Sequence, residues 1–235
     1  MVCRLIRRNV FVMTLQSIVT QLGGGMLKTV LLFFSTLIIA LPLGLLVSFA
    51  RMSNAHLFSK KFKPLRLLAQ VYISVMRGTP LMLQIMVVYF GPYYLFGIKI
   101  SSSYQIYAAI IAFAINYAAY FAEIYRGGIE SMPKGQYEAA KILGFTKAQT
   151  FFRIILPQVM KRILPSITNE VITLVKDTSL AFVIAYAEMF TMAKRIAAKE
   201  TSMLPFVAAG IFYYVFNLIV AIVMNRIEKK MSYYK

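Results

Sequence analysis

The sequence has few charged residues, and acidic ones are the scarcest. Asp, Glu, Lys and Arg make up 14% of its 235 residues, with 8 acidic residues against 26 basic ones. A typical soluble domain carries about 25% charged residues. Hydrophobic residues make up 60% of the chain, so a soluble fold would have too little polar surface to cover its apolar segments. The composition therefore excludes an ordinary soluble protein and indicates a membrane protein.

Residues that bind metals or form nucleophile–base pairs are almost absent. Cys3 is the only cysteine and His56 the only histidine. One cysteine excludes an internal disulfide framework and a Cys-rich metal site, and one histidine argues against a zinc site or a Ser-His-Asp triad. The phosphate-binding pattern Gly-x4-Gly-Lys-Ser/Thr does not occur either. We therefore expect no enzyme, no metal and no cofactor bound by this chain.

Long runs without charge are present instead. A helix needs about 20 residues to cross a hydrocarbon core of about 30 Å, and four uncharged runs reach that length: 29–50, 78–98, 100–122 and 201–225. With one less apolar segment they predict an all-α membrane helical bundle that forms a single domain over 1–235. We expect five spans, joined by one long loop over 126–165. The spans are expected at about 29–50, 68–95, 104–125, 166–187 and 204–225.

The N-terminal segment before the first span is amphipathic. Gln16 and Gln21 lie among apolar residues over 9–27, and three glycines, 23–25, close the segment. This pattern predicts a helix that lies in the membrane interface. A cleaved signal peptide is the alternative, because a basic start precedes the apolar run. No convincing small-x-small cleavage site precedes Gly23, so we treat the segment as part of the mature chain.

The net charge of +18 is explained by membrane topology rather than by binding to nucleic acid. With five spans and a cytoplasmic C-terminus, sixteen basic residues fall in inside segments and eight in outside segments. Arg77 and Lys176 fall within spans. The excess favours a cytoplasmic C-terminus and an extracytoplasmic N-terminus. The N-terminal cluster of Arg4, Arg7 and Arg8 runs against this orientation.

The expected fourth span is unusually polar. It contains Asn169, Glu170, Lys176 and Asp177. A charge at the centre of a span costs at least ~2.5 kcal/mol, and such residues face a bundle interior, a water-filled path or one another. We therefore expect protein to surround this helix.

The long loop has clear signals for two short helices. Ser131 with Pro133 is typical of a helix start, 134–143 reads as a helix of about three turns, and Gly144 is its stop. Thr146 followed three residues later by Gln149 is a capping box for a second helix. Within the first helix, Ala139 and Ala140 are small enough for a partner surface to approach closely. Glu138 offers an acceptor for a charge-assisted hydrogen bond.

These residues resemble the signature loop of ABC-importer permeases: Glu-Ala-Ala, three residues, Gly, nine residues, Ile, one residue and Leu-Pro. The matching positions are Glu138, Ala139, Ala140, Gly144, Ile154, Leu156 and Pro157. The flanking runs are similar to those of the polar amino acid permeases of the histidine, arginine, glutamine and glutamate type. These runs are 77–80, 116–120, 123, 126–129, 133–136, 156–158 and 176–180. We call residues 126–165 the signature loop.

The resemblance implies a fold, a location and a set of partners. The fold would be the type I ABC importer permease architecture, in the bacterial plasma (inner) membrane and in contact with its lipids. Two five-helix subunits, either two copies or two related chains, would form the pathway. Each would dock an ATPase subunit through the coupling helix, with Glu138, Ala139, Ala140 and Gly144, and that ATPase would bind the ATP and Mg²⁺. An extracytoplasmic binding protein would deliver the amino acid.

Polar residues of the third and fourth spans are our candidates for substrate binding. Asn116 and Tyr120 are four residues apart and share a helix face, while Thr173 lies one turn after Glu170. We expect Glu170 to accept from a substrate ammonium or guanidinium, which favours arginine, lysine, histidine or glutamine. Alternatively, Glu170 pairs with Lys176 or with an arginine at a subunit interface, and Asn116 makes an interhelical hydrogen bond.

A second class of function stays open at this point. A stand-alone secondary transporter or channel would use Glu170 and Asp177 as an ion relay and would work without an ATPase. The signature loop favours the first class. We expect Lys176 and Asp177 to form a local ion pair or to cap a helix break, and Arg77 to anchor the second span at the inner interface.

Overall fold

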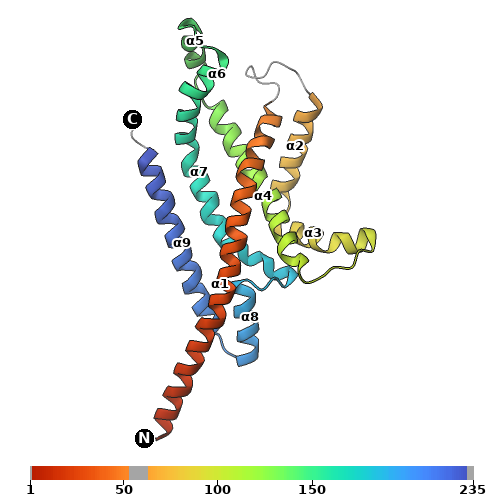
Figure 1. Ribbon diagram of the computed structural model, residues 1–235, viewed down its shortest axis with the longest axis vertical. Helices are drawn as coiled ribbons and strands as arrows, with labels where there is room; N and C mark the ends of the chain where they lie inside the picture. The colour runs from red at the N-terminus through yellow and green to blue at the C-terminus, as the bar shows by residue number, and fades with distance from the viewer. Residues whose placement is uncertain (1, 53–62, 232–235) are drawn as a thin grey trace.

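The computed structural model describes residues 2–52 and 63–231, with the backbone alone for residues 2–15 and 63. The regular elements of this part are all helices, as the composition predicts (Figure 1). The expected basic loop over 51–66, with His56, lies mostly outside the described residues. In chain order the elements are α1 (Val2–Arg51), α2 (Lys63–Gly78), α3 (Leu81–Phe96), α4 (Tyr104–Glu130), α5 (Lys134–Ile142), α6 (Lys147–Gln149), the π-helical turn η1 (Thr150–Ile155), α7 (Leu156–Asp177), the 3-10 segment η2 (Thr178–Ile184), α8 (Met189–Glu200) and α9 (Leu204–Met231).

The long helices α1, α4, α7 and α9 run along the long axis of the molecule (Figure 1). The short helices α5 and α6 lie at one end of the bundle, and α8 lies toward the other end beside α1. Helix α4 contacts α1, α2, α3 and α7, so it is the central element. The candidate substrate residues of α4 and α7 therefore lie on neighbouring helices.

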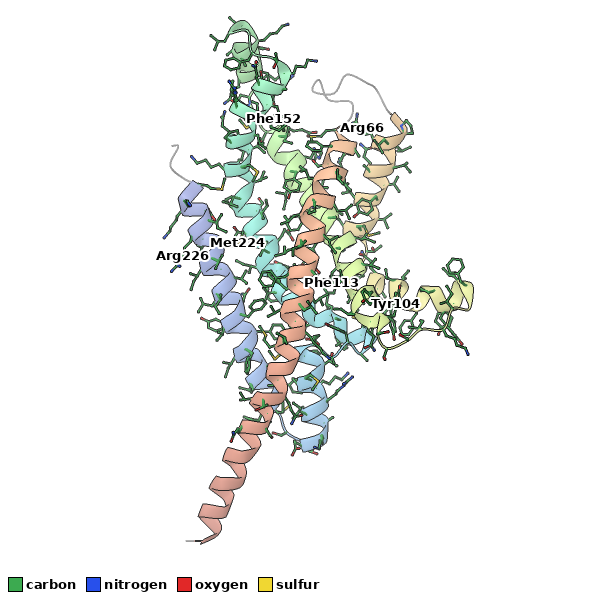
Figure 2. The ribbon with its side chains drawn as sticks, in the orientation of Figure 1. Arg66, Tyr104, Phe113, Phe152, Met224 and Arg226 are labelled. Carbon is green, nitrogen blue, oxygen red and sulfur yellow. The ribbon has the colours of Figure 1, made fainter. Side chains whose placement is uncertain are left out.

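Small residues let α4 pack closely against α1. Gly44 of α1 has no room for a side chain, because a Cβ atom there would lie 2.8 Å from the Cβ of Phe121. Such close approach through small residues is typical of helix pairs in membranes. Helix α4 also buries many alanines, and its Phe113 points into the bundle (Figure 2). The buried alanines are Ala108, Ala109, Ala112, Ala114, Ala118, Ala119 and Ala122.

Three described helical segments are long and apolar enough to cross a membrane: Gln16–Arg51 of α1, α4 and α9. Helices α2 and α3 would add a fourth span if the bent pair is counted as one membrane-spanning segment. Helix α7 is not among them; it carries Lys161 and Arg162 in its first half and Glu170, Lys176 and Asp177 in its second. Several of its apolar residues, Val159, Ile163 and Val171 among them, are buried, and the helix contacts α4 and α9.

The N-terminal segment differs from its prediction. Residues 9–27 do not form a separate interfacial helix but continue into the first span as α1, a single helix of 50 residues. The glycines expected to close the segment lie inside this helix. At Gly25 a Cβ atom would lie 2.9 Å from Cα of Met189, so this glycine allows α8 to pack against α1. Packing between helices, rather than a helix stop, explains the glycine.

The predicted second span is not straight. Helices α2 and α3 are bent by 108° at the break formed by Gly78, Thr79 and Pro80. Proline lacks an amide hydrogen and disfavours the helical conformation of the residue before it. The proline accounts for the position of the break, and the packing of α3 against α4 and η2 accompanies the bend.

The segment 188–203 connects the predicted fourth and fifth spans. Most of it forms α8, which packs against α1 and α9. The side chain of Glu188 is 0% exposed and caps this helix. The predicted fourth span, 166–187, corresponds to the second half of α7 followed by η2.

Candidate functional site

The signature loop has the two helices that the sequence predicts. Helix α5 ends two residues before Gly144, whose φ of 79° is left-handed, a conformation that glycine adopts without strain. The amide of Phe145 donates to the carbonyl of Ala140 at 3.0 Å, which closes the helix end. The capping box is also present: the amide of Gln149 donates to Thr146 Oγ1 at 3.3 Å, and the amide of Thr146 donates to Gln149 Oε1 at 2.9 Å.

The start of α5 differs from the prediction. Pro133, rather than Ser131, is the N-cap residue, and it makes no side-chain capping bond. The hydroxyl of Ser131 instead donates to the carbonyl of Gly128, at the end of α4. Arg162 of α7 donates to the carbonyl of Ser131 at 2.7 Å and to its hydroxyl at 2.9 Å. The base of the loop is therefore attached to α7.

The predicted coupling residues, which lie on α5 and just after it, differ in their exposure. Glu138, Ala139 and Gly144 are exposed, as a docking surface requires. Ala140 is only 2% exposed, because it faces the chain's own η1 rather than a partner. The expectation that both alanines present themselves to a partner is therefore wrong for Ala140.

Two apolar residues on this end of the molecule were missed in the sequence analysis. Ile142 is 86% exposed and Leu143 is 74% exposed. Large apolar side chains this exposed, next to one another and at the tip of a molecule, mark an interaction surface. The available signal was their position immediately before the helix stop at Gly144, where side chains project away from the bundle.

Asn116 lies on the side of α4 that faces the break between α2 and α3. Its side chain is 4% exposed, and Nδ2 donates to the carbonyl of Met76 and to Gln84 Oε1, each at 3.0 Å. The alternative of an interhelical hydrogen bond is therefore observed. Both Nδ2 hydrogens are used in this way, and Oδ1 accepts no hydrogen bond from another described residue. The side chain of Asn116 can therefore form a further hydrogen bond only as an acceptor, through Oδ1.

Tyr120 lies one turn further along α4 and contacts a cation. The guanidinium carbon of Arg77 lies 5.3 Å from the centre of its ring, a cation–π geometry. A nitrogen of Arg77 is also 3.9 Å from Glu123 Oε2. Arg77 therefore joins the end of α2 to α4.

Glu170 is half-buried on α7 and makes no ion pair or hydrogen bond with another described residue. In particular, the alternative pairing of Glu170 with Lys176 is not formed. The carboxylate is close enough to Asp177 and Arg77 to interact with both electrostatically. Thr173 is exposed, and no contact of its side chain joins it to the others.

Tyr117, missed in the sequence analysis, connects α4 to α7. Its hydroxyl donates to Asp177 Oδ2 at 2.7 Å, and its ring centre is 6.2 Å from that of Tyr120. It also interacts electrostatically with Glu170. The structure therefore gathers Tyr120, Glu170 and Asp177 around Tyr117. Asp177 takes this interhelical bond instead of an ion pair with Lys176.

Glu123 is surrounded by arginines from three helices. It forms ion pairs with Arg51 of α1 and Arg126 of α4, in addition to the contact with Arg77 of α2. Two nitrogens of Arg126 donate to Glu123 Oε2, at 2.7 and 3.2 Å. A buried carboxylate needs such partners. This cluster ties α1, α2 and α4 together.

Glu188 has no cationic partner within the described part of the chain and relies on neutral donors. It accepts from the amides of Phe190 and Thr191, from the hydroxyl of Thr191 and, at 2.8 Å, from the hydroxyl of Tyr213. The helix dipole of α8 adds to this stabilisation. Since Tyr213 belongs to α9, Glu188 fixes α8 on α9.

Comparison with known proteins gives consistent matches. The sequence pattern of the family described as "Binding-protein-dependent transport system inner membrane component" matches residues 40–233. The L-cystine transport system permease protein TcyB of Bacillus subtilis is 36% identical over 221 residues, which are 93% of this chain and 90% of that protein. The arginine transport system permease protein ArtQ of the same organism is 38% identical over 209 residues, 88% of this chain and 91% of that protein.

Solved structures show the same fold. A chain of the crystal structure of an amino acid ABC transporter with histidines has a TM-score of 0.82 and 32% sequence identity, and the match covers 93% of this chain and 97% of that one. A chain of the MetNI methionine ABC transporter in an inward-facing conformation has a TM-score of 0.65 at 17% identity, over 92% of this chain and 96% of that one. The second likeness is one of fold alone.

Proposed function

Because the chain belongs to the binding-protein-dependent transport system inner membrane components and is a permease subunit of an amino acid ABC importer, we propose that it imports polar or basic amino acids and that its signature loop couples it to a separate ATPase. It is a multi-pass inner-membrane protein of the type I importer architecture and not an enzyme. The observation that carries the proposal is the exposed apolar tip formed by Ile142 and Leu143 on the family's signature loop.

The coupling surface consists of the exposed residues at the end of α5. Ile142 and Leu143 would enter an apolar groove of the ATPase, while Glu138 would accept a hydrogen bond from its rim. Ala139 and Gly144 keep the approach open. Ala140 supports the helix from inside the chain. ATP and Mg²⁺ would be bound by the ATPase alone.

The remaining partners follow from the family, whose members work with ATPase and binding-protein partners. A second permease subunit, identical or related, would complete the pathway on the side of α4 and α7. With the signature loop and the C-terminus in the cytoplasm, α8 and the N-terminal part of α1 face the outside. The extracytoplasmic binding protein would dock there.

The substrate site we propose consists of Asn116, Tyr120, Glu170 and Thr173. Its chemistry favours a positive group: Asn116 has only its Oδ1 left to offer, and Glu170 is a carboxylate without an ion-pair partner among the described residues. Two acceptors and an aromatic ring suit an ammonium or guanidinium. Arginine, lysine, histidine and glutamine are therefore our expected substrates. The named relatives transport L-cystine and arginine, so their names alone do not decide this.

Co-purification with the ATPase tests the coupling surface. Gly144→Asp places a side chain at a left-handed φ and a charge beside Leu143, so the ATPase should no longer bind. Gly135→Asp is the matched control, because Gly135 is exposed in the same helix, has space for a side chain and has no positive φ. Retention of the ATPase by Gly144→Asp, with the permease correctly folded, would contradict the proposal.

A further inference from the structure

The break between α2 and α3 leaves backbone carbonyls without their helical partners. Helix α2 ends at Gly78, and Pro80 has no amide hydrogen to offer. The carbonyl of Met76 therefore lacks the amide that would follow four residues later in a continuous helix, because that position is Pro80. In a bilayer no water replaces that partner, so the protein must supply a donor.

Side chains fill this gap. The hydroxyl of Thr79 donates to the carbonyl of Val75 at 2.8 Å. The carbonyl of Met76 accepts from Gln84 Nε2 and from Asn116 Nδ2, both at 3.0 Å. Gln84 Nε2 is also 3.1 Å from the carbonyl of Thr79 and 2.8 Å from its hydroxyl. Residues of α3 and α4 thus hold the end of α2 in its bent position.

Gln84 has a second role through Asn116. Its Oε1 accepts from Asn116 Nδ2, whose other hydrogen goes to Met76. With both hydrogens committed, the carboxamide of Asn116 cannot turn its nitrogen toward the pathway. Its oxygen is the atom left for a ligand. The orientation of Asn116 is therefore set by Gln84.

We propose that Gln84 is a positioning residue for amino acid transport, which holds the α2–α3 bend and presents the oxygen of Asn116 to a positively charged group of the substrate. The role of Gln84 in presenting Asn116 to the substrate rests on the proposed function, whereas its role in holding the bend does not. Three observations support it together: the 108° bend, the capped carbonyl of Met76 and the complete use of the Asn116 donors.

Gln84→Met is the variant that removes both roles while keeping the length of the side chain. In proteoliposomes with the ATPase, the binding protein and a labelled basic amino acid, it should raise KM about tenfold, as expected when a polar contact is lost and its partner is left unsatisfied. The maximal rate should change much less. Gln70→Met is the control, since Gln70 lies on α2, the helix whose end Gln84 contacts, and makes no side-chain hydrogen bond to the described part of the chain.

Two further variants separate the roles of Gln84. Gln84→Glu keeps an acceptor for Asn116 but loses the donors to α2, so it should loosen the bend. The double variant Gln84→Asn, Asn116→Gln keeps the combined length of the pair. Its KM should therefore lie closer to that of the unmodified protein than the KM of Gln84→Met does. Rescue by the exchange would not be expected of a residue that merely fills space.

The bend itself can be measured without transport. Spin labels at Val71→Cys and Tyr94→Cys, two exposed positions on α2 and α3, report the distance between the helices in a Cys3→Ser background. Gln84→Met should broaden this distance distribution, and Gln70→Met should not. An unchanged distribution, or a broadened one with an unchanged KM, would overturn the inference. If the unmodified protein failed to import any basic amino acid, the proposed function would fall, and the distances would still decide whether Gln84 holds the bend.

Discussion

The signature loop and the polar region between α4 and α7 both depart from the usual pattern of buried apolar and exposed polar side chains. The loop exposes apolar side chains, and the polar region buries polar ones. At the tip of the loop, Ile142 and Leu143 are apolar and almost fully exposed. Around α4, Asn116 and Tyr117 are polar and buried, and each has a hydrogen-bond partner on another helix. The first arrangement is incomplete without a second protein. The second is nearly complete within the chain and leaves only a few acceptors for a ligand.

This contrast predicts that substitutions in the two regions impair different steps of transport. Changes in the loop should remove the ATPase and leave the affinity for the amino acid as it is. Changes in the polar region should alter the affinity or the stability and leave the ATPase attached. The predictions below test this separation, beginning with the largest effect.

Leu143→Asp should abolish uptake, with a loss of at least about a hundredfold, because a charge would replace an apolar anchor of the interface. Binding of the ATPase to the solubilised permease is the measurement. Leu143→Met, which conserves volume and polarity, should behave like the unmodified protein. An Asp variant that still binds the ATPase with unchanged affinity would remove the loop from the coupling surface.

Glu170→Gln should reduce uptake of a basic amino acid by about tenfold or more, since a charge-assisted hydrogen bond becomes a neutral one. The ATPase should remain bound. Glu228→Gln near the C-terminal end of α9, which lies outside the proposed site, is the control and should leave uptake unchanged. Unchanged uptake and unchanged ATPase stimulation in Glu170→Gln would show that this carboxylate does not meet the substrate.

Tyr117→Phe should lower the free energy of unfolding by ~1.5–3 kcal/mol, because Asp177 would lose a hydrogen bond inside the bundle. Thermal unfolding in detergent measures the effect. Tyr107→Phe, at an exposed position of the same helix, should change stability very little. Equal stabilities of the two variants would mean that the Tyr117–Asp177 bond contributes nothing.

Thr146→Ala should have the smallest effect, a loss of ~1 kcal/mol confined to the signature loop, since one half of the capping box is removed. Hydrogen exchange of the amides after Thr146 should become faster, while exchange in α4 stays the same. Thr146→Ser, which keeps the hydroxyl, is the control. A change that spreads into α4 would argue against the independence of the two regions.

The two regions also differ in how well the sequence predicts them. The loop depends on contacts between near neighbours, such as Thr146 with Gln149 and the turn at Gly144, and these patterns can be found in the sequence. The same reasoning could not show that Ala140 faces inward, because its burial depends on the packing of α5 against η1.

The polar region depends on contacts between distant residues. Asn116 meets Gln84, and Tyr117 meets Asp177, 60 positions away along the chain. No local pattern predicts such pairs, so only the helices and their polarity could be predicted. Glu188 illustrates the same limit: it lies between two predicted spans in the sequence, yet its carboxylate is buried among donors from α8 and α9. The glycine at position 25 likewise serves a contact with Met189 that lies 164 positions ahead in the chain.

Reconstituted uptake tests the central claim most directly. Proteoliposomes that hold this chain, its ATPase and its binding protein should accumulate a labelled basic amino acid when ATP is supplied on the side of the signature loop. Vesicles with this chain alone, given a proton or sodium gradient and no ATP, should accumulate none. Accumulation by the chain alone, driven by the gradient, would contradict the account and would identify a secondary transporter that uses Glu170 and Asp177 as its relay.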